Sequence, residues 1–301
     1  MPGIQEKIQT LKREKGAVIL AHFYQTMDIQ NIADHVGDSF ELARRAQQAA
    51  QPVIVLCGVR FMAESAKILN PEKTVLLPAI DAGCPMADMI SPDDVKKLKA
   101  ANPGAAVMCY VNSSAAVKAE CDICCTSSSA VRIAQSLPQK RIIFVPDQNL
   151  GAYVASQVPE KEFILFNGFC PTHHQVSAND VSAARAAHPE ARVLVHPECR
   201  PQVLKMADFI GSTAEILRYV GQSPEKEFII GTETGVAERL RQTLPGKNVY
   251  LLSSRLFCPN MKKTRIDDVL YSLENGVYEI RLSDSELNGA RACLERMVAV
   301  K

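Results

Sequence analysis

One pattern recurs three times along the chain, and it constrains the fold more than any other feature. Three cysteines precede a proline, at Cys84-Pro85, Cys170-Pro171 and Cys258-Pro259, and the intervals between these pairs are 86 and 88 residues. Each pair ends a short apolar run, in TVLLPAIDAGCP, EFILFNGFCP and VYLLSSRLFCP. A near-constant period of this length predicts a structural unit that is repeated three times.

The repeat extends over the segments between these cysteines. An apolar, strand-like run opens each copy, and a segment typical of an amphipathic helix follows it. A second strand-like run and a second helical segment then precede the run that ends in Cys-Pro. The first strand-like runs are AVILAHFYQ, AAVMCYVNS and ARVLVHPEC, and the first helical segments are GDSFELARRA, CTSSSAVRIA and GSTAEILRYV. The second strand-like runs are PVIVLCG, RIIFVPD and EFIIGTE, and the second helical segments are FMAESAKIL, LGAYVASQV and GVAERLRQTL.

This alternation of strands and helices indicates parallel sheets with right-handed crossovers and helices outside. We therefore predict an α/β fold of three homologous, Rossmann-like three-layer αβα domains, with parallel sheets, around a pseudo-threefold axis. The predicted domains are residues 1–86, 87–172 and 173–260. The tail, residues 261–301, ends in the helical pattern SELNGARACLERMVAV and is expected to pack back on the core.

Charge and hydropathy argue against several classes of function. The 301 residues include 34 Lys and Arg against 33 Asp and Glu, so a net charge of +1 offers no overall attraction for nucleic acid or an anionic membrane. The N-terminal segment lacks the apolar core of a signal peptide, and no apolar run approaches the roughly 18 residues of a membrane helix. We expect a cytoplasmic protein whose ten cysteines are bound to metal or buried rather than disulfide-linked.

The cysteines of the three Cys-Pro pairs form the first candidate site. Threefold packing would bring Cys84, Cys170 and Cys258 together beyond the carboxyl ends of the strands, where such sheets bind ligands. Three thiolates are one fewer than a structural zinc site takes, whereas an iron–sulfur cubane held by three cysteines leaves one iron open to substrate. The iron–sulfur interpretation fits better, while zinc, mononuclear iron and plain burial of the cysteines stay open.

Polar residues at the same edge form the second candidate site. Alternate residues of a strand point the same way, and each copy has a polar pair at this spacing after its first strand. These pairs are His22 and Tyr24, Tyr110 and Asn112, and His196 and Glu198. Helix-capping hydroxyls that could also bind anionic groups of a substrate are expected at Ser39, Ser127, Ser212 and the adjacent Thr213. His173, three residues after Cys170, is a candidate base or hydrogen-bond donor.

The segment CDICC, residues 121–125, contains a CxxC that is peculiar to the middle copy, because the other copies have ADHVG and ADFIG there. A buried pair and a redox-active pair are both compatible with Cys121, Cys124 and Cys125, and we do not assign them to the metal site. The chain has neither a GxGxxG nor a P-loop motif, which argues against a nucleotide fingerprint.

Several motifs in fixed order, covering nearly the whole chain, resemble those of the quinolinate synthase family, the A-protein of bacterial and archaeal NAD biosynthesis. They are AHFYQ, GDS, CYVNS, CTSSSA, FCP with a following histidine, HPEC, GST, and GTETG before the last Cys-Pro. The resemblance implies one 4Fe-4S cluster, bound by Cys84, Cys170 and Cys258 at the centre of a three-domain fold. Some relatives carry further cysteines near the third ligand, where this chain has FCPNMKK.

The resemblance also implies an activity. The enzyme would condense iminoaspartate with dihydroxyacetone phosphate to quinolinate, releasing phosphate and two waters, with the open iron as a Lewis acid in the dehydration. The residues implied to line the substrate cavity are His22, Tyr24, Tyr110, Asn112, His173, His196 and Glu198, and those implied to contact phosphate and carboxylate are Ser39, Ser127, Ser212 and Thr213. A functional link to the enzyme that supplies iminoaspartate is also expected.

We hypothesise that Glu198 and Tyr24 carry the isomerisation and deprotonation steps, with His22 and His196 positioning substrate oxygens. Two other interpretations stay open. One is a hydro-lyase that uses the same open iron on a small di- or tricarboxylate. The other is an iron–sulfur sensor or electron carrier, against which the polar pairs and the anion sites argue, because a carrier needs neither.

Overall fold

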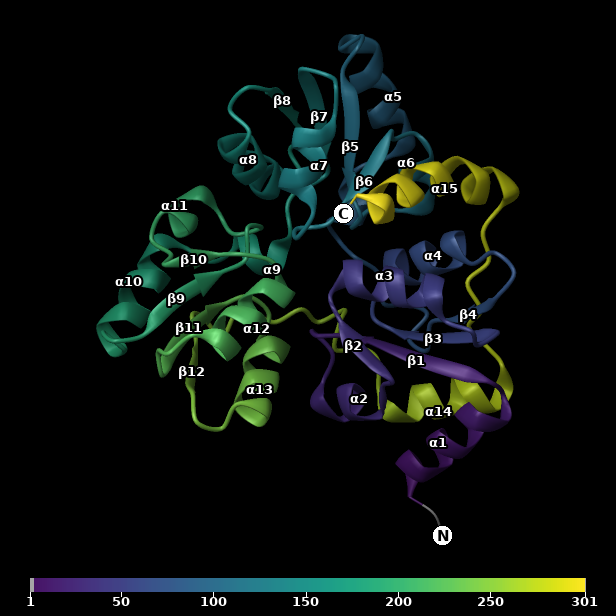
Figure 1. Ribbon diagram of the computed structural model, residues 1–301. Helices are drawn as coiled ribbons and strands as arrows, with labels where there is room; N and C mark the ends of the chain where they lie inside the picture. Colours follow the sequence, from purple (N-terminus) through teal and green to yellow (C-terminus); the bar gives the residue numbers. More distant parts are fainter. Residues whose placement is uncertain (1–2, 301) are drawn as a thin grey trace.

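The computed structural model describes residues 3–300, which form three parallel sheets arranged around a common centre and flanked by helices (Figure 1). Each sheet has four strands, in the orders β2-β1-β3-β4, β6-β5-β7-β8 and β10-β9-β11-β12. The strands are β1 (Ala17–His22), β2 (His35–Gly37), β3 (Val53–Cys57), β4 (Thr74–Leu76), β5 (Ala106–Tyr110), β6 (Ile123–Cys125), β7 (Arg141–Val145), β8 (Glu162–Leu165), β9 (Arg192–Val195), β10 (Phe209–Ile210), β11 (Glu227–Gly231) and β12 (Asn248–Leu251).

Helices connect the strands and continue beyond the third sheet. They are α1 (Ile4–Glu14), α2 (Met27–Ile32), α3 (Ser39–Gln48), α4 (Arg60–Leu69), the 3-10 helix η1 (Ala87–Met89), α5 (Pro92–Ala101), α6 (Ala115–Ala119), α7 (Ala130–Ser136), α8 (Gln148–Gln157), α9 (Pro171–His174), α10 (Ala178–Ala187), α11 (Pro201–Leu204), α12 (Thr213–Gln222), α13 (Thr234–Thr243), α14 (Ile266–Asn275) and α15 (Asp284–Ala299).

The predicted fold class is confirmed, but each sheet has one strand more than the sequence analysis predicted. The extra strands β2, β6 and β10 lie in the aligned segments ADHVG, CDICC and ADFIG. They have two or three residues each and pair along one side, with the first strand of their copy. Runs this short carry too little alternation to be recognised as strands.

Alternate residues of the strands build the two apolar faces that each three-layer unit requires. In the first sheet, Val18 and Leu20 of β1 pack with α3 and α4, whereas Ile19 and Ala21 pack with α1 and α14 on the other face. The third sheet is covered in the same way, by α10 and α11 on one face and α12 and α13 on the other. Because both faces are covered, the strands are apolar throughout, as parallel strands usually are.

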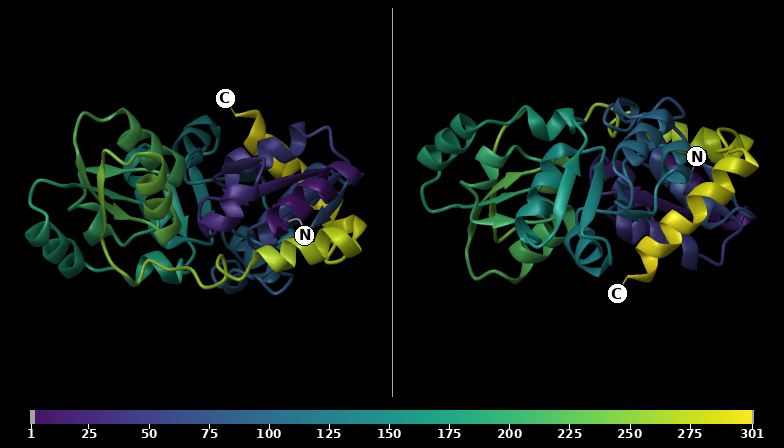
Figure 2. Two further views of the ribbon diagram at one scale, coloured as in Figure 1. Left: turned by 90° about the horizontal axis from the view of Figure 1, so that it is seen from below. Right: turned by 90° about the horizontal axis from the view of Figure 1, so that it is seen from above.

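The tail after the third sheet lies against the first two sheets. Figure 2 shows α14 and α15, in yellow, on the side of the first two sheets and away from the third. Two backbone hydrogen bonds join the tail to the first sheet, from Leu77 to Tyr278 (3.0 Å) and from Ile280 to Val75 (2.8 Å). Helix α15 packs against α6, β6 and α4. The limits of the three domains remain a prediction.

Among residues 3–300, no helix combines the length and the apolarity that crossing a bilayer requires.

Candidate functional site

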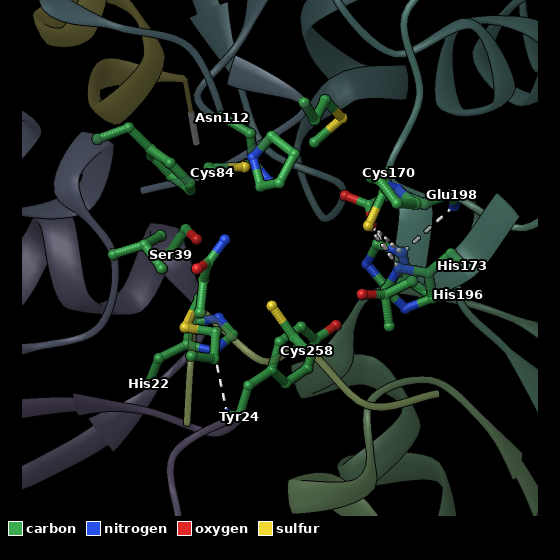
Figure 3. Close-up of a pocket in the computed structure, with 18 of the residues that line it drawn as sticks. His22, Tyr24, Ser39, Cys84, Asn112, Cys170, His173, His196, Glu198 and Cys258 are labelled. Atoms are coloured by element: carbon green, nitrogen blue, oxygen red, sulfur yellow. Dashed lines mark hydrogen bonds and ion pairs between the residues drawn. The ribbon is translucent and has the colours of Figure 1, made fainter. Parts of the chain in front are cut away.

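A cavity of about 150 Å³ lies where the carboxyl ends of the three sheets meet (Figure 3). Its volume is several times the roughly 30 Å³ that one water occupies in the liquid, so it can hold a small organic molecule. The predicted site residues that line it are His22, Tyr24, Ser39, Cys84, Tyr110, Asn112, Ser127, Cys170, His173, His196, Glu198, Thr213 and Cys258. The three copies therefore contribute to one site, and Ser212 is the predicted residue that does not line it.

The three Cys-Pro cysteines are distinct among the ten cysteines of the chain. Seven are buried, whereas Cys84, Cys170 and Cys258 are partly exposed and point their sulfur atoms into the cavity (Figure 3). Burial raises the pKa of all three thiols, to about 12 for Cys84, and the proximity of Cys258 adds to the rise at Cys84. The three thiols are therefore neutral on their own, and a bound cation is what would stabilise their thiolate forms.

The polar pairs of the cavity lie at the ends of the strands and in the loops that follow, rather than wholly within the strands. Strand β1 ends at His22 and strand β5 at Tyr110, so Tyr24 and Asn112 lie in the loops beyond. The expected common direction holds nevertheless, because both members of each pair line the cavity. In the first copy the loop is held by the backbone N–H of Tyr24, which donates to Nδ1 of His22 over 3.1 Å.

The third copy repeats this arrangement, since the backbone N–H of Glu198 donates to Nδ1 of His196 over 3.3 Å. In both imidazoles the proton must then lie on Nε2. Nε2 of His196 lies 3.2 Å from the hydroxyl of Ser127 and is the donor of that pair. Burial lowers the pKa of His22 to about 3 and that of His196 to about 4, so both are neutral hydrogen-bond donors at neutral pH.

A chain of hydrogen bonds joins two tyrosines across the three copies. The phenol of Tyr24 lies 2.8 Å from Oγ1 of Thr232, which lies 3.0 Å from Nε2 of His173. Nδ1 of His173 lies 2.7 Å from Oε2 of Glu198, and the phenol of Tyr110 donates to Oε1 of Glu198 over 2.6 Å. With His173 protonated on Nδ1, every bond in the chain has one donor and one acceptor.

The neighbouring histidines and the hydrogen bonds together decide the charge of Glu198. Burial alone would favour the neutral acid, but the imidazoles of His196 and His173 and the donors of His173 and Tyr110 hold the pKa of Glu198 well below its usual range. Glu198 is therefore a carboxylate at neutral pH. Burial and the charge of Glu198 raise the pKa of Tyr24 and Tyr110 well above the ordinary value, so both phenols keep their protons.

Of the three serines predicted to cap helices, Ser212 is confirmed and two were placed wrongly. Ser212 caps α12 and accepts from the N–H of Glu215, which explains why it does not line the cavity. Helix α3 is capped instead by Asp38, whose carboxylate accepts from two backbone N–H groups and forms a capping box, so Ser39 is its first residue. A carboxylate is the stronger acceptor, and it stands one residue earlier.

Ser127 also precedes its helix rather than caps it. The carbonyl of Thr126 accepts from the N–H groups of Ser129 and Ala130, which delays the start of α7 to Ala130. Ser127 is thereby free to meet His196 at the cavity. The hydroxyls of Ser39, Ser127 and Thr213 thus reach the cavity from the region before or at the start of α3, α7 and α12.

Sequence reasoning missed Asp38 and Thr232. Asp38 lines the cavity, and burial raises its pKa to about 6. Thr232 links Tyr24 to His173 from behind the cavity wall. Both stand in motifs that carried the family resemblance, GDS and GTETG, but nothing local to those motifs indicates which neighbour their side chains meet.

The cysteines of CDICC lie apart from the cavity, in the core under α15. Cys121, Cys124 and Cys125 are buried, and Sγ of Cys124 lies 3.1 Å from Sγ of Cys293. Sγ of Cys121 donates to the carbonyl of Val117 over 3.1 Å, and Sγ of Cys109 donates to the carbonyl of Tyr110 over 3.4 Å. Leaving these cysteines out of the metal site agrees with their position.

Ligand atoms of Cys170, His173 and Glu198 lie within 4.8 Å of one another, close enough to hold a single metal ion. Nδ1 of His173 is however 2.7 Å from the carboxylate of Glu198 and 3.3 Å from Sγ of Cys170. A proton on Nδ1 therefore already forms a hydrogen bond within this group. A mononuclear ion here would have to displace that proton. The group is therefore an alternative metal site that experiment must separate from the three-cysteine site.

Comparison with known proteins agrees with the resemblance. Residues 6–299 match the family described as Quinolinate synthetase A protein. The chain is 52% identical over 295 residues to the quinolinate synthase of Caldicellulosiruptor saccharolyticus, covering 98% of this chain and 97% of that protein. It is 53% identical over 296 residues to that of Alkaliphilus metalliredigens (98% of each chain). It is 50% identical over 297 residues to that of Methanoregula boonei (99% and 98%).

Proposed function

Because the chain belongs to the Quinolinate synthetase A protein family, we propose that it condenses iminoaspartate with dihydroxyacetone phosphate to quinolinate, releasing phosphate and two waters. The observation that carries the proposal is the convergence of one cysteine and one polar pair from each of the three copies on a single cavity. A sensor or electron carrier has no need of such a set of proton donors and acceptors around its metal.

A 4Fe-4S cluster is the cofactor of this proposal, with Cys84, Cys170 and Cys258 as its ligands. The donor set fits, because three thiols from three copies face one cavity and have no disulfide partner. Their raised pKa values also fit, since thiolates in a buried site need a cation to balance their charge. When bound by three thiolates, the cluster supplies one open iron, which acts as a Lewis acid in the loss of water.

Protons of the reaction move, in this proposal, through the hydrogen-bond chain. Tyr24 stays a neutral phenol, so when its Oη takes a proton from substrate it can pass its own proton through Thr232 to Nε2 of His173. Glu198 stays ionised and holds the proton of His173 on Nδ1, which leaves Nε2 as the basic atom. General acid–base catalysis of the isomerisation and deprotonation steps would thus use Tyr24, His173 and Glu198 as one unit.

The remaining cavity groups bind and orient substrate in this proposal. His22 and His196 present Nε2–H donors to substrate oxygens, and Tyr110 and Asn112 add polar contacts from the second copy. Hydroxyls for the phosphate and carboxylate groups come from Ser39, Ser127 and Thr213. Ser212 acts only through its cap on α12, which holds Thr213 in place.

We further propose that the protein works in the cytoplasm on small molecules alone. Its balanced charge offers nothing to nucleic acid, and a functional link to the enzyme that supplies iminoaspartate is expected.

The test is anaerobic reconstitution with iron and sulfide, with iron, sulfide and zinc counted per chain and the absorption spectrum recorded. The variants are Cys84→Ser, Cys170→Ser and Cys258→Ser, with Cys124→Ser as a buried control. The proposal expects about four irons in the parent protein, loss in the three variants, and retention in the control. Quinolinate formation from the two substrates is then measured on the loaded protein.

One further variant separates the two metal sites. A single ion held by Cys170, His173 and Glu198 would be lost on His173→Ala and kept on Cys84→Ser and Cys258→Ser. The three-cysteine cluster predicts the opposite result, with iron lost on Cys84→Ser and Cys258→Ser and kept on His173→Ala. Stoichiometric zinc, or iron that survives in the Cys84 and Cys258 variants, would overturn the proposed cofactor and the chemistry assigned to it.

A further inference from the structure

The turn that carries each Cys-Pro pair is tied to the second helix of its copy by the same backbone hydrogen bond. The first N–H of the helix donates to the carbonyl of the residue two positions before the cysteine. These bonds run from Arg60 to Ala82, from Gln148 to Gly168 and from Thr234 to Leu256, and each is 2.8 Å long. The threefold repeat therefore extends to the attachment of the three cysteine turns.

The second and third copies add a buried carboxylate to this attachment. Oδ2 of Asp147 accepts from the backbone N–H of Cys170 over 3.1 Å, and Oε1 of Glu233 accepts from that of Cys258 over 3.2 Å. Both side chains have no exposed surface. The first copy has Val59 at the corresponding position, a side chain without an acceptor.

The other oxygen of each carboxylate is bound to the start of the helix. Oδ1 of Asp147 accepts from the N–H groups of Asn149 and Leu150, both over 2.8 Å. Oε2 of Glu233 accepts from the N–H of Gly235 over 2.7 Å and lies 3.2 Å from Nζ of Lys262. Each carboxylate thus bridges a helix N-terminus and the backbone of one cysteine, which is more than capping the helix requires.

We propose that Asp147 and Glu233 are positioning residues for metal ligation, a proposal that rests on the proposed function of Cys170 and Cys258 as ligands. A hydrogen bond to the cysteine N–H fixes the plane of its preceding peptide and so limits where Sγ can point. A ligand that is held before the metal arrives loses less freedom on binding and releases the metal more slowly. Cys84 lacks this restraint.

Amide variants isolate this contact from the helix cap. In Asp147→Asn the remaining oxygen can still accept from Asn149 and Leu150, but the amide nitrogen cannot accept from Cys170. In Glu233→Gln the oxygen is retained by Gly235 and Lys262, so the nitrogen faces Cys258. The hydroxyl of Thr234, which donates to Oε1 of Glu233 over 3.1 Å, can turn to accept from that nitrogen. Asp94→Asn is the matched control, because Asp94 is a capping carboxylate of α5 that bonds to Ser91.

The first readout needs no metal and tests the hydrogen bonds themselves. Amide hydrogen exchange is measured on the metal-free protein. Asp147→Asn is expected to speed exchange at Cys170 by at least about tenfold without affecting Cys258, and Glu233→Gln to do the reverse. Unchanged exchange at both cysteines in both variants would overturn the proposal even if the protein binds its cluster normally.

The second readout is the rate at which the reconstituted, anaerobic protein loses iron to a chelator, with the electron paramagnetic resonance spectrum of the reduced protein. Both variants are expected to lose iron at least about tenfold faster than the parent and to alter the spectrum, whereas Asp94→Asn matches the parent. Parental rates and spectra in both variants would overturn the positioning role while leaving the three-cysteine cluster intact. A parent protein that binds no iron would instead overturn the proposed function, and this proposal with it.

Discussion

The phenol of Tyr110 donates a 2.6 Å hydrogen bond to Oε1 of Glu198, so two residues that lie 88 positions apart join the second copy to the third inside the cavity. Both side chains are buried. The bond gives Glu198 a second donor besides His173 and contributes to its low pKa. The charge of one residue in the third copy is thus set partly by a residue of the second.

Tyr110→Phe should therefore raise the pKa of Glu198 and lower the free energy of unfolding by about 1–3 kcal/mol, because an ionised buried oxygen loses its partner. Urea unfolding of the metal-free protein measures the stability. The pH dependence of kcat/KM on the loaded protein should show its acid limb at higher pH. Tyr153→Phe, which changes a half-buried tyrosine away from Glu198, is the control; an equal loss in both variants would contradict the assignment.

Thr232 is the only link of the hydrogen-bond chain in residues 3–300 that does not line the cavity, so its variants test the relay without removing a substrate contact. Thr232→Val keeps the shape but removes the hydroxyl, and turnover should fall on the order of 10²-fold or more. Thr232→Ser restores the hydroxyl and should recover most of the rate. Iron content should stay at the parental value in both. Similar turnover in the two variants would show that no proton passes through Thr232.

Two buried histidines should make the metal-free protein less stable in acid. An unfolded histidine binds its proton near pH 6.5, whereas His22 and His196 in the folded protein do so only near pH 3 and 4. Between these values the unfolded state holds more protons, so stability falls as pH falls, by about 1.4 kcal/mol per pH unit for each histidine. Asp38, whose pKa is raised to about 6, acts in the opposite sense below pH 6.

His22→Asn isolates one of these contributions, since asparagine does not titrate. Between pH 6.5 and 4.5 the parent should lose up to about 3 kcal/mol more stability than the variant. Urea unfolding at several pH values measures the difference. Parallel stability curves for the two proteins would mean that His22 takes up its proton without unfolding.

The docking of α15 can be tested by a pair of glycine variants. A Cβ at Gly289 would lie 2.7 Å from Cβ of Ala119 in α6, whereas one at Gly221 in α12 would meet nothing within 4 Å. Gly289→Ala should destabilise the protein by about 1–3 kcal/mol through overpacking. Gly221→Ala should stabilise it by about 0.5–1 kcal/mol, because alanine favours a helix. Changes of the same sign and size would refute close packing of the tail on the second copy.

Local periodicity made much of the fold predictable from the sequence. Continuous apolar runs marked the long strands, and the 86- and 88-residue intervals marked equivalent positions, including the three cysteines and the polar pairs. The features that the sequence did not predict correctly also lie in short segments. The strands β2, β6 and β10 are too short to show a pattern. The start of α3 depended on Asp38, rather than Ser39, accepting from the first N–H groups, and the start of α7 on the carbonyl of Thr126 accepting from Ser129 and Ala130.

The sequence by itself thus determined the class of fold, the threefold repeat and the residue types at the sheet ends, because strands and helices impose their periods on neighbouring positions. Only the tertiary structure decided which of these residues meet. The bonds of Tyr24 to Thr232 and of Tyr110 to Glu198 join one copy to another. The three sulfur atoms likewise come from three copies and face one cavity. Such contacts depend on how three packed units face a common cavity, and no periodicity within one unit records that.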